Sequence, residues 1–289
     1  MPDSTVMATT KAVAAALLVA APLAGIALYD HAEPRPEAQK ESPVTLAVTP
    51  QQLDLLPRPC LPATLTVTFH NGSGEGAYPS AFVRPDAPLR VSREAVTTYV
   101  PADYDVAVPV QVLVPRLTPP GEYTVLLEAG RERLSVPVVV SEPPSDPARN
   151  LVLGQETTAS STNGLLTPCG VVDGNRTYTT QGYNRPATAW ADDTPGVFPD
   201  QIETTLAEPA RIGRVDLYTH AQRQFALRDW DVQALTGAGW QTVAQVRGHT
   251  AGLFSARFEP VTASAVRIVM LATNGYAYST VVEVEVYEG

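Results

Sequence analysis

From residue 44 to the end of the chain, apolar residues recur at every second position in one short segment after another. The clearest runs are 65–69, 106–114, 136–140, 230–234 and 282–286. This period of two is typical of half-buried β-strands, whose side chains point alternately to the core and to solvent. Clusters of Gly, Pro, Asn and Asp separate the runs, and residues 150–289 contain no long stretch with a helical period. The pattern predicts an all-β protein built as antiparallel sandwiches or jelly rolls.

The runs form two groups on either side of a proline-rich stretch. At 289 residues the chain is long enough for two domains that each bury a core. We expect a first sandwich over residues 44–141, a linker over 142–149 and a second domain over 150–289. Pro109 and Pro137 stand inside strand-like runs. Because proline donates no ladder hydrogen bond, these two strands are expected at a sheet edge or at a bulge.

The N-terminal 43 residues have a different composition. Lys11 precedes an uncharged stretch that is rich in Ala, Leu and Val, and a polar run follows it. Residues 1–29 therefore resemble an export signal or a membrane anchor, and residues 30–43 a polar linker. Gly25-Ile26-Ala27 is the one weak small-x-small cleavage candidate at the end of the apolar stretch. Either alternative predicts that the rest of the chain lies outside the cytoplasm, secreted or anchored to the membrane by this segment.

The charge and the cysteine content of the chain limit which binding partners and which cellular compartment we expect. The chain has 30 Asp and Glu against 20 Lys and Arg, so nucleic acid and anionic membrane surfaces are not expected as partners. An exported protein can hold disulfides, and Cys60 and Cys169 are its two cysteines. A bond between them would join the two predicted domains and close a loop of about 110 residues. Two buried thiols that never meet are the alternative, since connectivity does not follow from sequence.

The sequence contains no arrangement that predicts catalysis. The four histidines lack the spacing of metal ligands, and the chain has neither a glycine-rich phosphate loop nor a serine-hydrolase elbow. Asp192-Asp193 and the pair Glu283 and Glu285 resemble a glycosidase pair only superficially, because adjacent or strand-terminal acids are usually solvated or bind cations. His70, beside Asn71 at a strand-to-turn junction, is interpreted as a solvated turn residue. We predict a protein that is not an enzyme.

Several ordered pieces of the second half resemble one known family. They are Asn150-Leu151-Val152-Leu153-Gly154, Val171-Val172-Asp173-Gly174-Asn175, Leu227-Arg228-Asp229-Trp230-Asp231-Val232 and Val282-Glu283-Val284-Glu285-Val286-Tyr287. In this order they are similar to a discoidin domain, also called a coagulation factor five/eight type C domain, a group that includes many bacterial carbohydrate-binding modules. The resemblance implies a galactose-binding-like β-sandwich jelly roll, with Trp230 and Trp240 in its core. Gln201 stands where the family usually has a tryptophan.

The resemblance also implies a structural calcium ion. The family commonly holds one near the Asp-Gly-Asn turn, through the Asp side chain, backbone carbonyls, a hydroxyl and the first Glu of the final strand. Carried over to this sequence, the ligands are Asp173 and Glu283 through their side chains, Asn175 through its carbonyl, and Thr177 or Thr180. A plain Asx turn at Asp173 with a solvated Glu283 is the alternative.

Family ligands bind at loops on one end of the sandwich, so aromatic and hydrogen-bonding loop residues are the candidates for glycan contact. Three loops qualify, at residues 181–185, 220–225 and 272–278. A sugar stacks its CH-rich face on an aromatic ring and offers hydroxyls to polar side chains. The predicted ligand-binding residues are His220, Arg223, Phe225, Asn274, Tyr276 and Tyr278, with Trp190 left open. Ordinary surface decoration is the alternative for each of them.

The first domain resembles an immunoglobulin-like accessory sandwich of exported bacterial carbohydrate-active proteins, with a turn at Pro119-Pro120-Gly121 that leads into a late strand. We interpret it as a spacer. The prediction for the whole chain is an exported, non-catalytic protein that presents a discoidin-type module to extracellular glycan or polysaccharide, with calcium as a structural ion. A cell-surface adhesion or protein-interaction module, or an accessory subunit of a separately encoded glycoside-active enzyme, is the alternative.

Overall fold

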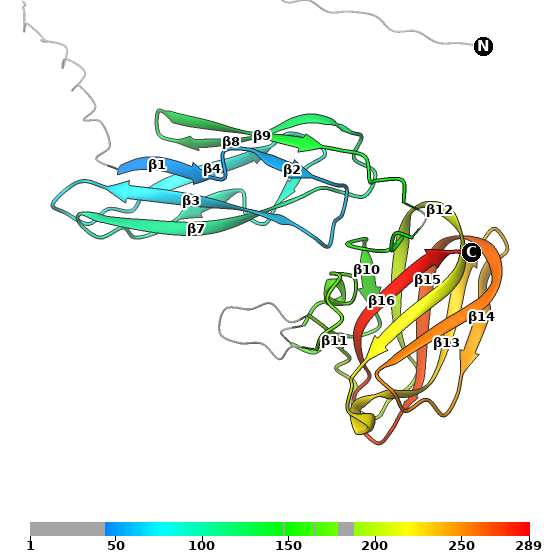
Figure 1. Cartoon of the computed structure of the whole chain (residues 1–289). Helices are drawn as coiled ribbons and strands as arrows, with labels where there is room; N and C mark the ends of the chain where they lie inside the picture. Colours follow the sequence, from blue (N-terminus) through cyan, green and yellow to red (C-terminus); the bar gives the residue numbers. More distant parts are fainter. Residues whose placement is uncertain (1–43, 147, 165, 179–187) are drawn as a thin grey trace, which may run out of the picture. The chain divides into compact units, whose positions relative to one another are not determined.

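The computed structural model describes residues 44–146, 148–164, 166–178 and 188–289 (Figure 1). The predicted N-terminal signal or anchor, the polar linker, Thr180 and the loop at 181–185 lie outside the described residues. The described part is all-β, with two short 3-10 turns, which confirms the predicted fold class. Its strands form two β-sandwiches, from residues 44–140 and from the C-terminal part. None of the helices within the described ranges is long and apolar enough to span a bilayer.

The first sandwich packs a four-stranded sheet on a five-stranded one. The four-stranded sheet has the order β1 (Val44–Thr49), β3 (Ala63–Asn71), β7 (Tyr104–Leu113), β5 (Arg90–Val91). The five-stranded sheet has the order β2 (Leu53–Leu55), β9 (Glu132–Val140), β8 (Gly121–Ala129), β4 (Ser80–Pro85), β6 (Ala95–Thr97). The predicted alternation holds in β3, where Leu65, Val67 and Phe69 are buried and their neighbours are not.

The two strand prolines lie where the ladder does not need their nitrogen. Pro109 pairs with Thr66 of β3, while β5 on the other side of β7 reaches only residues 112 and 113. Pro137 pairs with Thr124 of β8, and β2 joins β9 only from residue 138 onward. Both prolines are exposed and face a locally unpaired edge. The edge prediction is therefore confirmed residue by residue.

The second sandwich is made by two long strands that bend from one layer into the other. β12 (Asp200–Thr219) and β15 (Leu253–Thr273) pair with each other along most of their lengths, with register shifts near residues 205–210 and 212–214. On one side of the bend they join β10 (Thr157–Ala159), β13 (Leu227–Thr236) and β14 (Gly239–Val246). On the other side they join β16 (Thr280–Glu288) and β11 (Trp190–Ala191). The 3-10 turns are η1 (Pro168–Val171) and η2 (Arg223–Phe225).

Strand β16 departs from the half-buried pattern that its alternation predicts. Val284 and Val286 face the core as expected, but Glu283 and Glu285 are buried as well, at 0% and 4% exposure. The segment before β10 and the turn after η1 cover this second face. Leu151 donates its N–H to the Val286 carbonyl at 2.8 Å, and this polypeptide crosses the strand far from it in sequence. The alternation of residues within a strand does not show whether a distant segment covers its second face.

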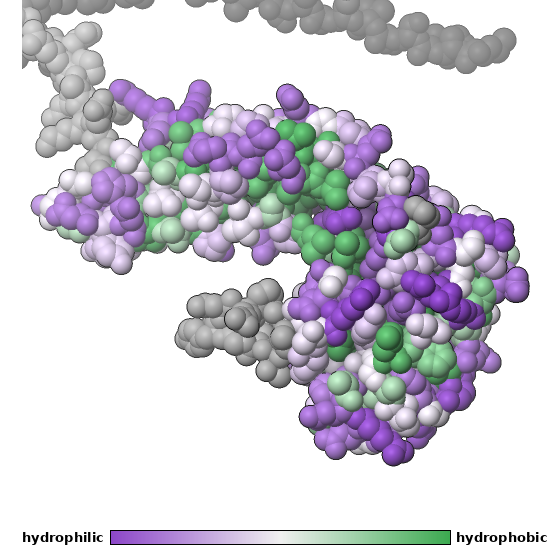
Figure 2. All heavy atoms as spheres, in the orientation of Figure 1, coloured by the Kyte–Doolittle hydropathy of each residue, from purple (hydrophilic) through white to green (hydrophobic). Residues whose placement is uncertain are grey.

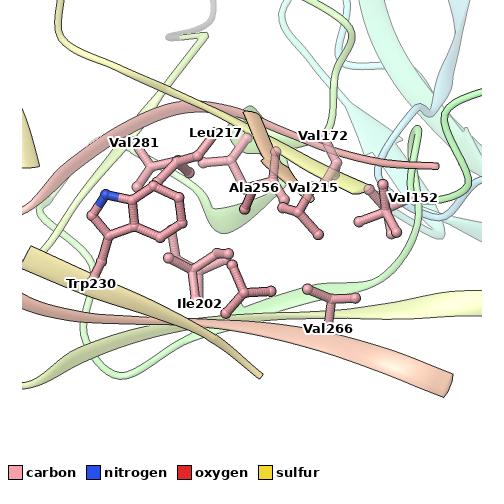
Figure 3. Close-up of a cluster of buried hydrophobic side chains, with 14 of the residues drawn as sticks. Val152, Val172, Ile202, Val215, Leu217, Trp230, Ala256, Val266 and Val281 are labelled. Atoms are coloured by element: carbon pink, nitrogen blue, oxygen red, sulfur yellow. The ribbon is translucent and has the colours of Figure 1, made fainter. Parts of the chain in front are cut away.

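The core of the second sandwich surrounds Trp230 (Figure 3). Its indole lies beside Leu217 and Val281, and Ile202 comes from below the ring in this view. All of these side chains are 1% exposed or less. The expectation that Trp240 is also a core residue is wrong. Trp240 pairs with Leu235 of β13, which pairs in turn with Ala265 of β15. Trp240 is half-buried on the outer face of the sheet. There the Arg267 guanidinium lies 3.9 Å from its ring centre.

Cys60 and Cys169 form a disulfide, with their Cα atoms 5.1 Å apart. The sequence left open whether the two thiols meet, and the structure selects the bonded alternative. The bond closes a loop with a sequence separation of 109 residues. In the chain-entropy model a loop of this size stabilises the folded state by about 4 to 5 kcal/mol.

The surface in view is mostly hydrophilic, with apolar patches between the polar side chains (Figure 2). Large exposed side chains occur on both sandwiches. They include Tyr78, Phe82, Tyr99 and Tyr104 on the first sandwich and Tyr178 and Tyr276 on the second. Tyr78 packs against Tyr99, and Tyr178 and Tyr276 belong to one series of ring contacts, which makes these two groups candidates for recognition surfaces.

Candidate functional site

One end of the second sandwich is held together by a buried threonine. Thr219 is the last residue of β12, and its hydroxyl donates to the Thr280 carbonyl at 2.9 Å. The same oxygen accepts the Leu227 N–H at 3.1 Å. Thr219 therefore ties together the start of β13 and the start of β16. The two loops that lead into these strands, residues 220–226 and 274–279, are fixed at their bases.

The 274–279 loop has its own internal support. The Thr273 hydroxyl donates to the Tyr276 carbonyl, and Gly275 takes a φ of 115°, a conformation that a side chain disfavours. At the end of the loop, the buried Ser279 donates its N–H to Asp192 at 2.6 Å and its hydroxyl to Asp200 at 2.7 Å. Burial raises the pKa of the Asp200 carboxyl. The loop is thus held at both ends by polar groups that have little access to water.

These two loops and the segment near residue 178 bring five rings into one row. Tyr178 lies 4.8 Å from His220, His220 lies 4.8 Å from Phe225, and Phe225 lies 4.7 Å from Tyr276, all measured between ring centres. Tyr276 is 5.5 Å from Tyr278. The rings are tilted or edge-on to one another, which is a favourable arrangement for aromatic quadrupoles. We call this set the aromatic row.

The aromatic row lines an open cavity of about 310 Å³. Its other described lining residues are Asn163, Leu166, Ala191 and Thr280. The imidazole of His220 has a defined tautomer, because its Nδ1 accepts the Gln222 N–H at 3.0 Å. In the neutral ring the proton is then on Nε2, which leaves that nitrogen as a donor. The cavity offers ring faces, one imidazole donor, a side-chain amide and a hydroxyl.

The match to a family model falls on this sandwich. Residues 156–284 match the model of the F5/8 type C domain. This part of the chain is an F5/8 type C domain. The resemblance drawn from the sequence is confirmed, and the matched range contains β10 through most of β16.

Solved structures similar to this chain include carbohydrate-binding modules. Chitosan-binding module 1 of a chitosanase/glucanase from Paenibacillus sp. IK-5 is 28% identical, with 48% of this chain and 98% of that one covered and a TM-score of 0.40. The family 32 carbohydrate-binding module of NanJ from C. perfringens, solved with galactose, is 16% identical, with 48% and 98% covered and a TM-score of 0.41. No curated protein matches the chain.

The F5/8 type C domain brings four of the six predicted ligand-binding residues into the cavity. His220, Phe225, Tyr276 and Tyr278 all line it. Arg223 is exposed and is not part of the described lining. Asn274 has another role in the fold, because its amide donates to the carbonyls of Ala226 and His249, at 3.1 and 2.9 Å. Only the side-chain oxygen of Asn274 remains for a ligand.

Tyr178 is the residue that sequence reasoning missed. It is 39% exposed and ends the described segment that follows η1, about 40 residues before its ring partner His220. Its place in the chain, just past the predicted calcium turn, gave no reason to assign it to the ligand loops. Trp190, which the sequence left open, is fully buried, and its Nε1 donates to the Ser161 carbonyl at 2.9 Å. Its Nε1 also donates to the Thr162 hydroxyl at 3.0 Å, which holds the residues just before the lining residue Asn163.

The predicted calcium ligands lie on the covered face of β16. Glu283 accepts the Gly174 N–H on Oε1 at 3.0 Å, while its buried Oε2 has no hydrogen-bond partner among the described residues. Burial raises the pKa of Glu283 to about 9, and the nearby carboxylate of Asp173 contributes to this shift. Burial also raises the pKa of Asp173. The Asx turn of the alternative interpretation is present, because Asn175 donates its N–H to Asp173 Oδ1 at 2.8 Å, whereas its solvated Glu283 is wrong.

The other predicted ligands, Asn175 and Thr177, also take part in hydrogen bonds. Asn175 accepts the Thr177 N–H on its side-chain oxygen at 2.9 Å, and the Thr177 carbonyl accepts the Thr188 hydroxyl at 2.9 Å. Within the described ranges no three His, Cys, Asp or Glu side chains gather as a metal cluster. Calcium sites complete their six to eight oxygens with backbone carbonyls. A buried carboxylate oxygen without a donor, beside a second acid, fits a cation of this type.

Beside this pair, Glu285 is neutralised by the protein itself. Arg176 forms a two-pronged ion pair with it, at 2.7 and 3.0 Å, and the Tyr287 hydroxyl donates to it at 2.9 Å. Charge-assisted pairs of this geometry are among the stronger hydrogen bonds in proteins. The contrast is informative, because Glu285 has a cationic partner from the chain and Glu283 has none in the described residues.

Proposed function

We propose that the F5/8 type C domain binds a glycan in the cavity lined by the aromatic row. The observation that carries this proposal is the convergence of Tyr178, His220, Phe225, Tyr276 and Tyr278 on one open cavity at the loop end of the sandwich. The cavity size is within the usual range of small-ligand sites.

The chemistry of the cavity is suited to a sugar. Tyr276 is 39% exposed, as is Tyr178. An exposed ring edge or face of this kind can pack against the CH groups of a pyranose. The Nε2–H of His220 and the Asn163 amide can then bond to hydroxyls at the rim of the sugar. Since the loops are fixed at Thr219 and Ser279, the rings are ordered before the ligand arrives, which lowers the entropic cost of binding.

We further propose that calcium binds at Asp173 and Glu283 and acts as a structural ion, with backbone carbonyls from the turn that contains Asn175 and Thr177. What supports this is the donor set, two neighbouring acids of which one is fully buried. The ion would neutralise both charges and link the 173–177 turn to β16. Its expected contribution is to stability, and the aromatic row requires no direct contact with it.

Export and non-catalytic action complete the proposal. The disulfide between Cys60 and Cys169 supports an oxidising compartment, because such bonds rarely persist in the cytosol. Mass measurement of the natural protein after alkylation, with and without prior reduction, tests this point. Release of reducing ends from a bound glycan by the purified protein would contradict the non-catalytic part.

The experiment that tests the binding proposal is a glycan array followed by titration calorimetry with the best oligosaccharide. Tyr276→Ala should weaken binding at least tenfold, because stacked rings dominate such contacts. The control is Tyr104→Ala, which removes an exposed tyrosine of the first sandwich, outside the cavity. If Tyr276→Ala and Tyr104→Ala bind the oligosaccharide equally well, the cavity is not the site. If the folded protein binds no glycan, an adhesion partner or an accessory role beside a separate enzyme replaces this function.

A further inference from the structure

The first sandwich carries an aromatic ridge of its own on the hairpin of β4 and β6. Ser80 pairs with Thr97 and Phe82 with Ala95, and the isolated bridge between Ala77 and Val100 extends the same ladder. In this register Tyr78 stands opposite Tyr99. Side chains two positions apart along a strand share a face, so Tyr78, Tyr99 and Phe82 belong to one face together with the Ser80 and Thr97 hydroxyls.

That face is the outer one. Ala81, Val83, Val96 and Val100 alternate with it and are buried, at 2% exposure or less. The three aromatic side chains are among the most exposed of the chain, with Tyr78 at 75%, Phe82 at 53% and Tyr99 at 50%. The two ends of the ridge, Tyr78 and Phe82, are four positions apart along the chain, a length of about 13 Å. The spacer interpretation of the first sandwich gives no reason for this concentration of exposed rings.

The ridge is rigid at the tyrosine end. Tyr78 and Tyr99 pack on each other with ring centres 5.0 Å apart. Tyr99 also lies directly over Gly76, where an added Cβ would be 2.3 Å from its hydroxyl oxygen. Glycine at this position therefore allows the ring to lie flat against the backbone.

A buried amide fixes the backbone under these rings. Asn71 is 0% exposed, and the two N–H groups of its Nδ2 lie within hydrogen-bond distance of three carbonyls, so one N–H is shared between two of them. The acceptors are the carbonyls of Glu75, Val100 and Pro101, at 2.8, 3.2 and 2.9 Å. Both segments that carry the tyrosine pair are tied to the same side chain. A flexible surface loop would not need this support, whereas a preformed recognition surface benefits from it.

The groups around the rings are hydrogen-bonding and locally paired in charge. The Ser80 and Thr97 hydroxyls lie 2.8 Å apart between the tyrosine pair and Phe82. Arg84 lies over the Phe82 ring at 5.6 Å and bonds to Glu128 at 2.7 Å. Arg133 reaches the other oxygen of Glu128 at 3.0 Å. The ridge thus offers ring faces, hydroxyls and an arginine-carboxylate pair, which is the chemistry that recognises an uncharged polyhydroxylated chain.

We propose that this ridge is a second glycan-binding surface, which takes an extended, uncharged polysaccharide lying along β4 and β6. Because β6 is the edge of its sheet, the surface is open along that side, unlike the cavity of the F5/8 type C domain. The choice of a glycan as ligand rests on the proposed function, whereas the location of the surface does not. Two sites on one chain would bind a polymer with higher avidity than either alone.

The test uses the full chain in pull-down with insoluble chitin and cellulose, and in affinity electrophoresis with soluble xylan and mixed-linkage glucan. The double variant Tyr78→Ala with Tyr99→Ala should lose at least tenfold in affinity for a bound polysaccharide, while its affinity for a short oligosaccharide stays unchanged. The variant with phenylalanine at both positions keeps the rings and should retain binding. Tyr104→Ala, on the opposite sheet, is the control for loss of an exposed tyrosine.

The outcomes separate the two sites. If the alanine double variant binds every polysaccharide as the control does, the ridge proposal is overturned, and the cavity is judged by Tyr276→Ala alone. If only the ridge variant loses binding, the ridge stands and the cavity proposal fails. If the alanine and phenylalanine variants lose binding equally, stacking is not the cause and the proposal is overturned. Absence of polysaccharide binding by the unaltered protein overturns it as well.

Discussion

Replacing Glu283 by glutamine should change the stability of the F5/8 type C domain in opposite directions with and without calcium. Glu283 is fully buried, and its pKa is raised from 4.5 to about 9. In chelator at pH 7 the folded protein therefore holds this carboxyl protonated, while the unfolded chain releases the proton. At about 1.4 kcal/mol per pH unit, the 2.5 units between 4.5 and pH 7 cost the folded state about 3 kcal/mol.

Glutamine removes this cost and keeps an oxygen that can accept the Gly174 N–H. In chelator, Glu283→Gln should raise the free energy of unfolding by up to about 3 kcal/mol at pH 7. The unaltered domain should also lose stability as pH rises from 4.5 towards 9. Over this range the unfolded chain releases the Glu283 proton while the folded domain keeps it, so each further pH unit favours unfolding. The free energy of unfolding of Glu283→Gln should lack this dependence on pH.

Calcium should reverse which of the two proteins, the unaltered domain or Glu283→Gln, is the more stable. An ion that binds only the folded domain stabilises it by about 4.1 kcal/mol at a thousand times its Kd, which exceeds the advantage of about 3 kcal/mol that the variant has in chelator. The variant has one charged ligand fewer and should gain much less. In millimolar calcium the unaltered domain should therefore be the more stable of the two, or the difference seen in chelator should at least disappear.

Urea unfolding followed by tryptophan fluorescence measures this directly. All three tryptophans of the chain, Trp190, Trp230 and Trp240, lie in the F5/8 type C domain, so the signal reports that domain. The control is Glu203→Gln, which removes a half-exposed partner of Arg267 and should shift stability by less than about 1 kcal/mol, equally in both buffers. If Glu283→Gln destabilises the domain by the same amount with calcium and with chelator, the carboxylate is only a structural hydrogen-bond acceptor. Calcium binding at Glu283 is then refuted.

Three further predictions concern the packing of the two sandwiches. Asn71→Ala removes the two N–H donors that three carbonyls share and the oxygen that accepts the Ser73 N–H, and it should destabilise the first sandwich by about 3 kcal/mol, measured by calorimetry; a loss under 1 kcal/mol would show that water replaces the amide. Serine at both Cys60 and Cys169 should lower the free energy of unfolding by about 4 to 5 kcal/mol, and an unchanged urea midpoint would contradict the loop-closure argument. Leu217→Ala empties part of the core around Trp230 and should cost about 3 to 5 kcal/mol in the fluorescence assay, whereas a cost below 1 kcal/mol would mean that the core refills the space.

Local periodicity in the sequence predicted the strands well because most of them have one face on a core. The alternation at residues 65–69 and 230–234 corresponds to buried and partly buried positions in β3 and β13. The same rule failed for β16, because the segment around Leu151 and the turn at Gly174 cover its second face. Periodicity describes one strand at a time and carries no information on what crosses that strand.

The candidate site was also predicted only in part, because the residue type alone does not show what a side chain contacts in the fold. The loop at 220–225 and the loop at 272–278 were recognised from residue type, and four of their six candidates line the cavity. Asn274 looked available, but its amide is used to join the two loops. Tyr178 reaches the row only through the fold, and Trp240 is placed outside by the register of β13 with β14. The outcomes for Asn274 and Tyr178 depend on contacts between segments far apart in the chain, which a single sequence does not display.

The most direct test of glycan binding at the aromatic row is a nuclear magnetic resonance titration of the protein with the oligosaccharide selected by the array. We expect the ring signals of Tyr178, His220 and Tyr276 to shift together with one saturating affinity, while those of Tyr104 stay in place. Shifts confined to residues outside the cavity, with the signals of the aromatic row unchanged at saturation, would contradict it.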